Sequence, residues 1–419
     1  MHHHKFIQDT DHPILIPGQS PWADTMVLNP AIVRLPGSDR IHMLFRATGP
    51  CSYLYRVGRV DPYPIFLGYA WSDDDGQTWQ ADFSRPALAP QLANEPDDLW
   101  ITNANGERVI NYANGCIEDP RLTLIDDKLY LTAACRMFPP GPYWENDEPL
   151  QCTPSWALTA HETFGDAATQ NITVNVLFEV DPQKLAEQDY DHCFSYVGPL
   201  TDPSRGDNRD AFLFPEKLKI NGQSMYVCVH RPRDPWHYPG GKPGQSPAIY
   251  LAAAQTLEDL PSDRALHIPL AQGLLEWEGN RVGGSFPPIR IASNQWLLPY
   301  HGKQNDKIGY TQSFMILEQD QDGWPRLKHR CPDRLLYATQ DWQHSDRFTI
   351  PCIFTCGGVI TKDQQLLMSY GAADEVIGTA KAYLNALVKH IQRFDQYGQS
   401  ITMCNTLSKV ILNKLKDII

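Results

Sequence analysis

The chain carries few basic residues for its length of 419. Lys and Arg number 36 against 49 Asp and Glu, which gives a formal net charge of −13. A surface of this sign repels polyanions, so the sequence argues against a nucleic-acid binder and against binding to anionic membranes. A cluster of basic side chains in a cleft would be local, and it would point to an anionic ligand.

Long apolar runs are also absent. No run reaches the ~20 residues of a membrane-spanning helix, and the first residues, Met-His-His-His-Lys, lack the apolar stretch of a secretory signal. The ten cysteines are spread thinly, and Cys135 and Cys228 lie in apolar, strand-like segments typical of buried thiols. Cys352 and Cys356 lack a second Cys or His pair at zinc spacing. We therefore expect a cytoplasmic protein with no bound metal and no membrane partner.

Turn-forming residues are abundant, with 34 Pro and 28 Gly along the whole chain. Together with 42% apolar residues, this composition predicts a soluble globular protein of many short strands. A pattern recurs five times: a Pro- or Gly-marked entry, a short apolar strand, a polar turn and a stronger apolar strand. The five copies cover residues 29–45, 118–135, 214–230, 286–301 and 356–370.

Five such hairpins, each followed by a further strand, predict an all-β five-bladed β-propeller over residues 1–390. A β-sandwich with similar hairpins is the alternative. Residues 72–79, Ser-Asp-Asp-Asp-Gly-Gln-Thr-Trp, fit the Asp-box turn between two outer strands of a propeller blade. We expect this turn to be structural.

Two segments depart from the repeat. Residues 138–207 combine a Pro-rich stretch with many acidic residues, and we expect blade strands plus a long loop over the active face. Apolar positions at helical spacing occur over residues 383–391 and in the tail. The sequence therefore predicts a C-terminal helical tail over 391–419, through which the chain could form a homo-oligomer.

Polar residues occur at matched strand ends of several repeats. One such residue is usually a surface or turn residue, but several basic ones on an acidic protein indicate an anion site beside a carboxyl group. The candidates are Glu118, Asp119, Arg209, Asp210, Glu216, Lys217, His230, Arg231, Arg290, Tyr300, His301, Tyr370 and Asp374.

Several of these residues stand in blocks that resemble glycoside hydrolase family 130, the β-mannoside phosphorylases and related mannosidases. The resemblance covers about residues 25–390. The blocks are Gly-Cys-Ile-Glu-Asp-Pro-Arg at 115–121, Arg-Asp-Ala-Phe-Leu-Phe-Pro-Glu-Lys at 209–217, His-Arg-Pro at 230–232, Pro-Pro-Ile-Arg at 287–290, Tyr-His-Gly at 300–302 and Tyr-Gly-Ala-Ala-Asp at 370–374. The family fold is a five-bladed propeller, which agrees with the repeat count.

The resemblance implies that Asp119 is the general acid that protonates the glycosidic oxygen of a short β-mannoside, relayed through a mannose hydroxyl. Inorganic phosphate, a co-substrate, would attack the anomeric carbon from the opposite face and give α-mannose 1-phosphate. No cofactor is implied. The expected phosphate-binding residues are Arg209, Arg231, Arg290, His301 and Tyr310, with Arg290 at a position where Lys is expected. The expected substrate-binding residues are Asn29, Arg46, Glu118, Arg136, Lys217, His230 and Asp374.

Three alternatives stay open on the sequence alone. An inverting β-mannosidase would use water and a second carboxylate such as Glu216 as its base. A propeller can bind carbohydrate or a protein partner without turnover. A sialidase would need repeated Asp-boxes, and only one is present. Trp144, Trp156 and Trp236 could stack on sugar rings or belong to the core.

Overall fold

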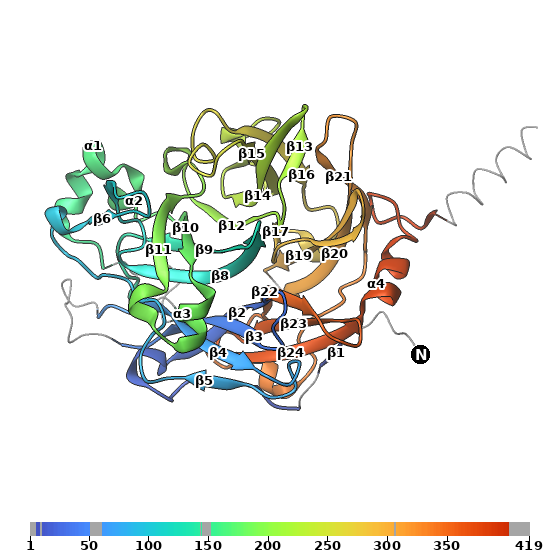
Figure 1. Ribbon diagram of the computed structural model, residues 1–419, viewed down its shortest axis with the longest axis horizontal. Coiled ribbons are helices and arrows are strands. Elements are labelled where there is room, and N and C mark those ends of the chain that lie inside the picture. The colour runs from blue at the N-terminus through green and yellow to red at the C-terminus, as the bar shows by residue number, and fades with distance from the viewer. Residues whose placement is uncertain are drawn as a thin grey trace, which may run out of the picture.

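The computed structural model describes residues 6–8, 11–50, 61–142, 144, 152–305 and 307–401. The described chain is mostly β with a few short helices, as the composition predicted (Figure 1). Its strands form five antiparallel sheet units, numbered 1 to 5 along the chain. A single parallel bridge, Ile65 with Cys116, joins units 1 and 2 into one eight-stranded sheet.

Unit 1 contains β2 (Met26–Arg34), β3 (Ile41–Thr48), β4 (Ile65–Ser72) and β5 (Gln80–Asp82). Unit 2 contains β8 (Cys116–Ile125), β9 (Lys128–Arg136), β10 (Val174–Val180) and β11 (Phe194–Pro199). Unit 3 contains β12 (Asn208–Leu213), β13 (Leu218–Ile220), β14 (Gln223–Pro232), β15 (Ile249–Ala254) and β16 (Leu266–Ala271). Unit 4 contains β17 (Arg281–Gly284), β18 (Ile289–Ala292), β19 (Gln295–Gln304), β20 (Gly309–Gln319) and β21 (Pro325–Arg330). Unit 5 contains β22 (Ile353–Ile360), β23 (Gln365–Ala372), β24 (Val376–Tyr383) and, from the start of the chain, β1 (Ile7–Gln8).

The first strands of the units lie next to one another in the middle of the molecule (Figure 1). β2 contacts both β8 and β22, and β12 contacts both β8 and β17. Apolar side chains pack between neighbouring units: Val229 and Leu251 of unit 3 share a cluster with Leu298 and Met315 of unit 4. Because each sheet buries its faces against the next unit, the polar ends of the first strands are brought together.

Three of these first strands share one irregularity. The register of β2, β8 and β12 shifts at Asn29, Asp119 and Asp210 respectively. Each residue has a left-handed backbone, with φ of 48°, 53° and 52°. Asn and Asp tolerate this conformation better than other non-glycine residues. The three residues therefore occupy the same structural position in units 1, 2 and 3. The extra residue at a β-bulge changes the direction in which the side chain points.

The repeat in the sequence is confirmed, but two of its copies were predicted to start too late. The first strand of unit 3 is interrupted, and β12 precedes the Phe214-Pro215 entry used to define the repeat. Unit 4 is interrupted in the same way between β17 and β18. The central ends of these strands therefore lie at Asn208–Asp210 and Arg281–Gly284, several residues before the predicted ones.

The helices belong to the insertion and to the C-terminal region. The insertion holds α1 (His161–Phe164), α2 (Asp166–Thr169) and α3 (Pro182–Glu187), besides β10 and β11. A two-stranded sheet of β6 (Trp100–Thr102) and β7 (Arg108–Ile110) stands beside it. The predicted helix over 383–391 is observed as α4 (Leu384–Ile391), which buries Leu387 and Ile391 in the core. The rest of the predicted tail, from residue 402, lies outside the described residues.

The Asp-box between β4 and β5 is structural, as expected. Asp74 accepts hydrogen bonds from the backbone N–H of Thr78 at 2.8 Å and from its hydroxyl at 2.6 Å. Trp79 packs against the apolar cluster of units 1 and 5. In the described part of the chain, no helix is long and apolar enough to span a membrane.

Candidate active site

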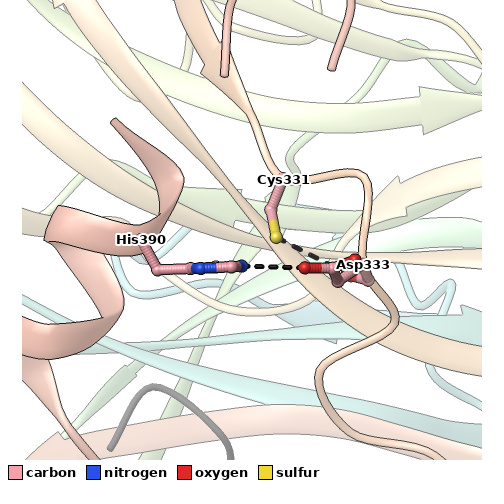
Figure 2. A group of neighbouring side chains, drawn as sticks. All are labelled: Cys331, Asp333 and His390. Atoms are coloured by element: carbon pink, nitrogen blue, oxygen red, sulfur yellow. Dashed lines mark hydrogen bonds and ion pairs between the residues drawn. The ribbon is translucent and has the colours of Figure 1, made fainter. Parts of the chain in front are cut away.

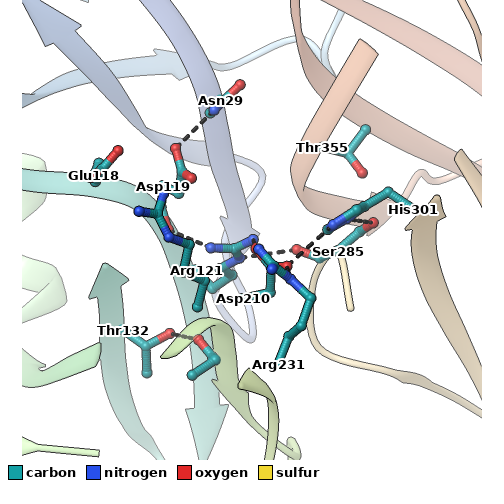
Figure 3. Close-up of polar contacts among 12 residues, drawn as sticks. Asn29, Glu118, Asp119, Arg121, Thr132, Asp210, Arg231, Ser285, His301 and Thr355 are labelled. Carbon is teal, nitrogen blue, oxygen red and sulfur yellow. Dashed lines mark hydrogen bonds and ion pairs between the residues drawn. The ribbon is translucent and has the colours of Figure 1, made fainter. Parts of the chain in front are cut away.

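Asp119 lies at the centre of the first group of polar side chains. Its Oδ1 accepts a hydrogen bond of 2.8 Å from the Asn29 amide (Figure 3). It also accepts one of 3.0 Å from Nη1 of Arg46. The same Arg46 nitrogen lies 2.9 Å from Glu118, whose other oxygen is 3.8 Å from Nε of Arg136. The structure thus brings together five of the predicted residues.

The charges around Asp119 determine its protonation. Burial raises the pKa of Asp119, but Arg46, Arg121 and the Asn29 amide outweigh this effect, so the pKa lies below its ordinary value. Opposite charges and hydrogen bonds to a carboxylate favour its ionised form. Asp119 is therefore a carboxylate in the free protein.

Asp210, the equivalent of Asp119 in unit 3, forms the second group. Its Oδ1 lies 3.2 Å from Nη2 of Arg121, while its Oδ2 accepts from Nε of Arg231 and lies 3.2 Å from Nε2 of His301 (Figure 3). Burial raises the pKa of Asp210, but Arg231, His301 and Arg121 reverse this and hold it well below the ordinary value. Asp210 is thus a buried anion that orients positively charged side chains.

Arg121 connects the two groups. This fully buried side chain donates to the backbone carbonyls of Asp119 at 2.9 Å and Ser285 at 3.1 Å, besides pairing with Asp210. A guanidinium held by three acceptors from three sheet units has little freedom to move. It therefore fixes the positions of Asp119 and Asp210 relative to each other.

Two further cations lie near Arg231. Arg281 of β17 and Lys303 of β19 are register partners, and the Lys303 ammonium lies 4.8 Å from the ring centre of Tyr310. Burial, and then Arg281, lower the pKa of Lys303, and Arg231 contributes in the same direction. Tyr310 packs against His301, with ring centres 5.5 Å apart. Arg231, Arg281 and Lys303, called here the cationic group, therefore gather beside His301 and Tyr310.

Arg209 and Asp374 also lie close enough to Asp119 for its charge to shift their pKa values. Nε of Arg209 lies 3.2 Å from Asp207, and Asp207, Glu118 and Asp119 raise the pKa of Arg209 despite its burial. Asp374 accepts a hydrogen bond of 3.3 Å from the Cys352 thiol. Burial raises the pKa of Asp374, and the negative charge of Asp119 contributes to the rise while Arg46 opposes it.

Arg290 and Lys217 do not join this site. Arg290 pairs in register with Trp296, whereas His301 lies five residues further along β19, which corresponds to about 16 Å of strand. Its half-exposed guanidinium pairs with Glu216. Lys217 pairs with Asp126 at 3.5 Å in a hairpin turn. The prediction placed both at the central strand ends because it took β13 and β18 for the starts of the first strands.

His230 also points away from the site. Adjacent residues on a strand face opposite sides of a sheet, so His230 turns from Asp210 as Arg231 turns towards it. Its Nδ1 lies 3.0 Å from the Asn208 amide, and its ring packs against Tyr238 and Tyr250. Burial lowers the pKa of His230 well below its ordinary value. It is a neutral core histidine.

The three tryptophans differ in their surroundings. Trp156 donates to the Asn94 carbonyl and packs on Phe138, so it belongs to the core. Trp144 packs edge-on against Tyr63, with ring centres 4.7 Å apart. Trp236 is 52% exposed. Stacking on a sugar stays a prediction for Trp144 and Trp236.

Three residues of this site were not among the predicted candidates: Arg121, Arg281 and Lys303. Asp210 was a candidate at a strand end, but its equivalence to Asn29 and Asp119, each an Asx residue before a small or proline residue, became clear only from the bulges. Arg281 and Lys303 leave no such signal, because only the pairing of β17 with β19 places them side by side.

Comparison with known proteins identifies the relatives of this chain. The family described as "beta-1,4-mannooligosaccharide phosphorylase" matches residues 205–393. A 1,2-β-oligomannan phosphorylase and a β-1,2-mannobiose phosphorylase, both from Thermoanaerobacter sp. (strain X514), are each 24% identical over 88% of this chain and 95% of their own length. A solved structure of β-1,2-mannobiose phosphorylase from Listeria innocua covers 93% of this chain and 99% of its own, with 17% identity and a TM-score of 0.60, and so shares the fold.

The fold, the polar site and these relatives define a carbohydrate-active enzyme. The chain is similar to proteins of glycoside hydrolase family 130, and the match of the family model to residues 205–393 includes the predicted blocks around Arg231 and His301.

Proposed function

We propose that this enzyme cleaves a short β-mannoside by phosphorolysis with inversion, giving α-mannose 1-phosphate and a free sugar. The five sheet units would be the blades of a five-bladed propeller, and the substrate would bind where their first strands meet. Asp119 would protonate the leaving oxygen, and inorganic phosphate would attack the anomeric carbon from the opposite face.

The cationic group carries this proposal. A net charge of −13 disfavours anion binding over most of the surface, yet Arg231, Arg281 and Lys303 gather next to His301 and Tyr310. The hydrogen bond described for Arg231 uses its Nε, so its two terminal nitrogens can reach a ligand. Nε of Arg281 is buried and has no hydrogen-bond partner among the described residues. Guanidinium groups bind phosphate through paired hydrogen bonds.

The Asp119 group supplies complementary contacts for a sugar. Oδ1 of Asn29 is buried and lacks a hydrogen-bond partner among the described residues. An unpaired buried acceptor costs free energy unless a ligand satisfies it, and a sugar hydroxyl would do so. Arg46, Glu118 and Asp374 offer further donors and acceptors around it.

The proton balance of the reaction closes without another cofactor. Asp119 would take up a proton from solvent before cleavage and give it to the leaving oxygen. Hydrogenphosphate would form the new bond to the anomeric carbon and then release its own proton to solvent, which leaves the ester dianion of mannose 1-phosphate. A dianion bound at the cationic group raises the pKa of a nearby carboxyl, so phosphate binding would convert Asp119 from carboxylate to acid.

Relatives support the substrate class. The two Thermoanaerobacter proteins are named for β-1,2-linked mannose, and a third relative, from Ruminococcus albus, is a β-1,4-mannooligosaccharide phosphorylase that is 26% identical over 44% of this chain. A location in the cytoplasm and self-association through the C-terminal tail stay predictions.

The test is a comparison of β-1,2- and β-1,4-mannobiose with and without inorganic phosphate. Formation of α-mannose 1-phosphate only when phosphate is added supports the proposal. Release of mannose at the same rate without phosphate would establish hydrolysis instead. Glu216, the base suggested for hydrolysis, hydrogen-bonds Trp296 and pairs with Arg290, away from the described Asp119 group.

A further inference from the structure

A second cluster of reactive side chains lies outside the active site, where α4 packs against the end of unit 4. Cys331 and Asp333 follow β21, and His390 stands in the last turn of α4 (Figure 2). The thiol sulfur, one carboxylate oxygen and one imidazole nitrogen of these residues all lie within 4.8 Å of one another. Nε2 of His390 is 2.8 Å from Oδ2 of Asp333.

We propose that Cys331, Asp333 and His390 bind a zinc ion. Thiolate, imidazole and carboxylate are the three ligand types that zinc takes in proteins, at about 2.0–2.3 Å from the metal. Ligand atoms around one tetrahedral ion then lie roughly 3.3–3.6 Å apart. The present spacing of at most 4.8 Å needs only small side-chain rotations to reach that geometry.

The backbone that carries two of the ligands is already fixed. The Ser313 hydroxyl donates to the Asp333 carbonyl at 2.8 Å and lies 3.4 Å from the Cys331 carbonyl. The Trp277 indole donates to the Pro332 carbonyl between them at 3.1 Å. Because supporting hydrogen bonds orient the ligands of a metal site, the segment would lose little entropy on binding.

Burial differs among the three ligands in a way that leaves a coordination position for water. Cys331 is fully buried and the His390 side chain is 9% exposed, while the Asp333 side chain is 54% exposed. The metal would therefore enter from the Asp333 side, and water would complete the tetrahedron. The Cys331 thiol would release its proton to solvent on binding, because only the thiolate is a zinc ligand.

Zinc at this position would join α4 to the segment after β21. α4 packs on the sheet through Leu387 and Ile391, but in the described chain its ion pair with unit 4 depends on the half-exposed Asp333. A ligand that binds only the folded state stabilises it. The site would therefore hold the last described helix on the body of the enzyme.

Cobalt is the most informative probe, because a cobalt–thiolate bond gives an intense near-ultraviolet charge-transfer band. The full-length protein, stripped with a chelator, is titrated with Co²⁺ and then with Zn²⁺. We expect one equivalent of Co²⁺ to produce the band and Zn²⁺ to abolish it. Histidines at positions 2–4 can also bind these metals, but they give no thiolate band.

Variants assign the band to this cluster. C331S should remove it, and H390Q should weaken Co²⁺ binding by at least about tenfold, the lower end of the effect of losing even a supporting group. D333N alters an exposed side chain and so tests the site without disturbing the core. C193S is the matched control, since Cys193 and Cys331 are both buried and each thiol donates to a backbone carbonyl, that of Asp181 and that of Asp333 respectively.

Two results would overturn the proposal: no thiolate band at one equivalent of Co²⁺, or a band that persists in C331S. Neither outcome bears on phosphorolysis, because the cluster contributes no residue to the site around Asp119.

Discussion

The side-chain amide of Asn29 donates a hydrogen bond of 2.8 Å to the carboxylate of Asp119, although 90 residues separate them. Both stand in left-handed conformation at the same bulge of neighbouring sheet units. The bond therefore joins two copies of one repeat. The Asn29 carbonyl oxygen is buried, has no hydrogen-bond partner in the described chain, and lies against Gly371 of β23.

Replacing Asp119 with Asn should abolish turnover and leave the fold intact. Loss of a general acid costs about 10²–10⁴-fold in rate, and Asn tolerates the left-handed backbone at this position. Initial rates of mannose 1-phosphate formation and the melting temperature should be measured together. Activity within twofold of the wild type would exclude Asp119 as the acid.

Variants of Arg281 and Arg290 distinguish the cationic group of the structure from the phosphate-binding residues predicted from the sequence. Removing a charged hydrogen bond costs about 1.5–3 kcal/mol, or roughly 10–100-fold. We expect R281A to raise the KM for phosphate by that factor and to change the KM for the mannoside less. R290A is the matched control, because Arg290 pairs with Glu216 near solvent. An effect of R290A equal to that of R281A would contradict the assignment.

Asp210 should be essential for stability. D210N leaves Arg121 and Arg231 buried without a countercharge, which costs about 3–5 kcal/mol. The pKa of Asp210 is depressed in the folded state, so its contribution is present above the unfolded pKa and is lost as the pH falls through the folded pKa. Urea unfolding at neutral pH measures the effect. D259N, which breaks the exposed Arg264–Asp259 pair, should cost less than about 1 kcal/mol.

The contribution of Asp374 to folding stability should depend on pH in the opposite way to that of Asp210. Its pKa is raised in the folded state, chiefly by burial, so its contribution is favourable below the unfolded pKa and is lost as the pH rises through the folded pKa. D374N removes the cost of burying an ionised carboxylate. It should therefore raise the melting temperature at pH 7 while lowering activity. At a pH below the unfolded value of 3.8 the gain should vanish. An equal gain at both pH values would show that ionisation of Asp374 is not the cause.

The repeat and the catalytic candidates could be found from the sequence because each has a local cause. Hairpin turns and the Asp-box depend on neighbouring residues, and the block around Glu118 and Asp119 is contiguous. Arg290 was misplaced since local pattern cannot reveal that the first strand of unit 4 breaks between β17 and β18. Likewise, nothing in the order His230-Arg231 indicates which of the two side chains faces the centre.

The sequence by itself determined the strand-rich architecture, the five-fold repeat and the carboxylic acid at the start of β8, because alternation, turn chemistry and short motifs are written in neighbouring residues. Only the tertiary structure decided which polar side chains meet. Arg121, Arg231 and His301 come from three sheet units, and they converge on Asp210 because the units bury their apolar faces against one another. Packing of non-local strands, which no short segment encodes, therefore selected the members of the site.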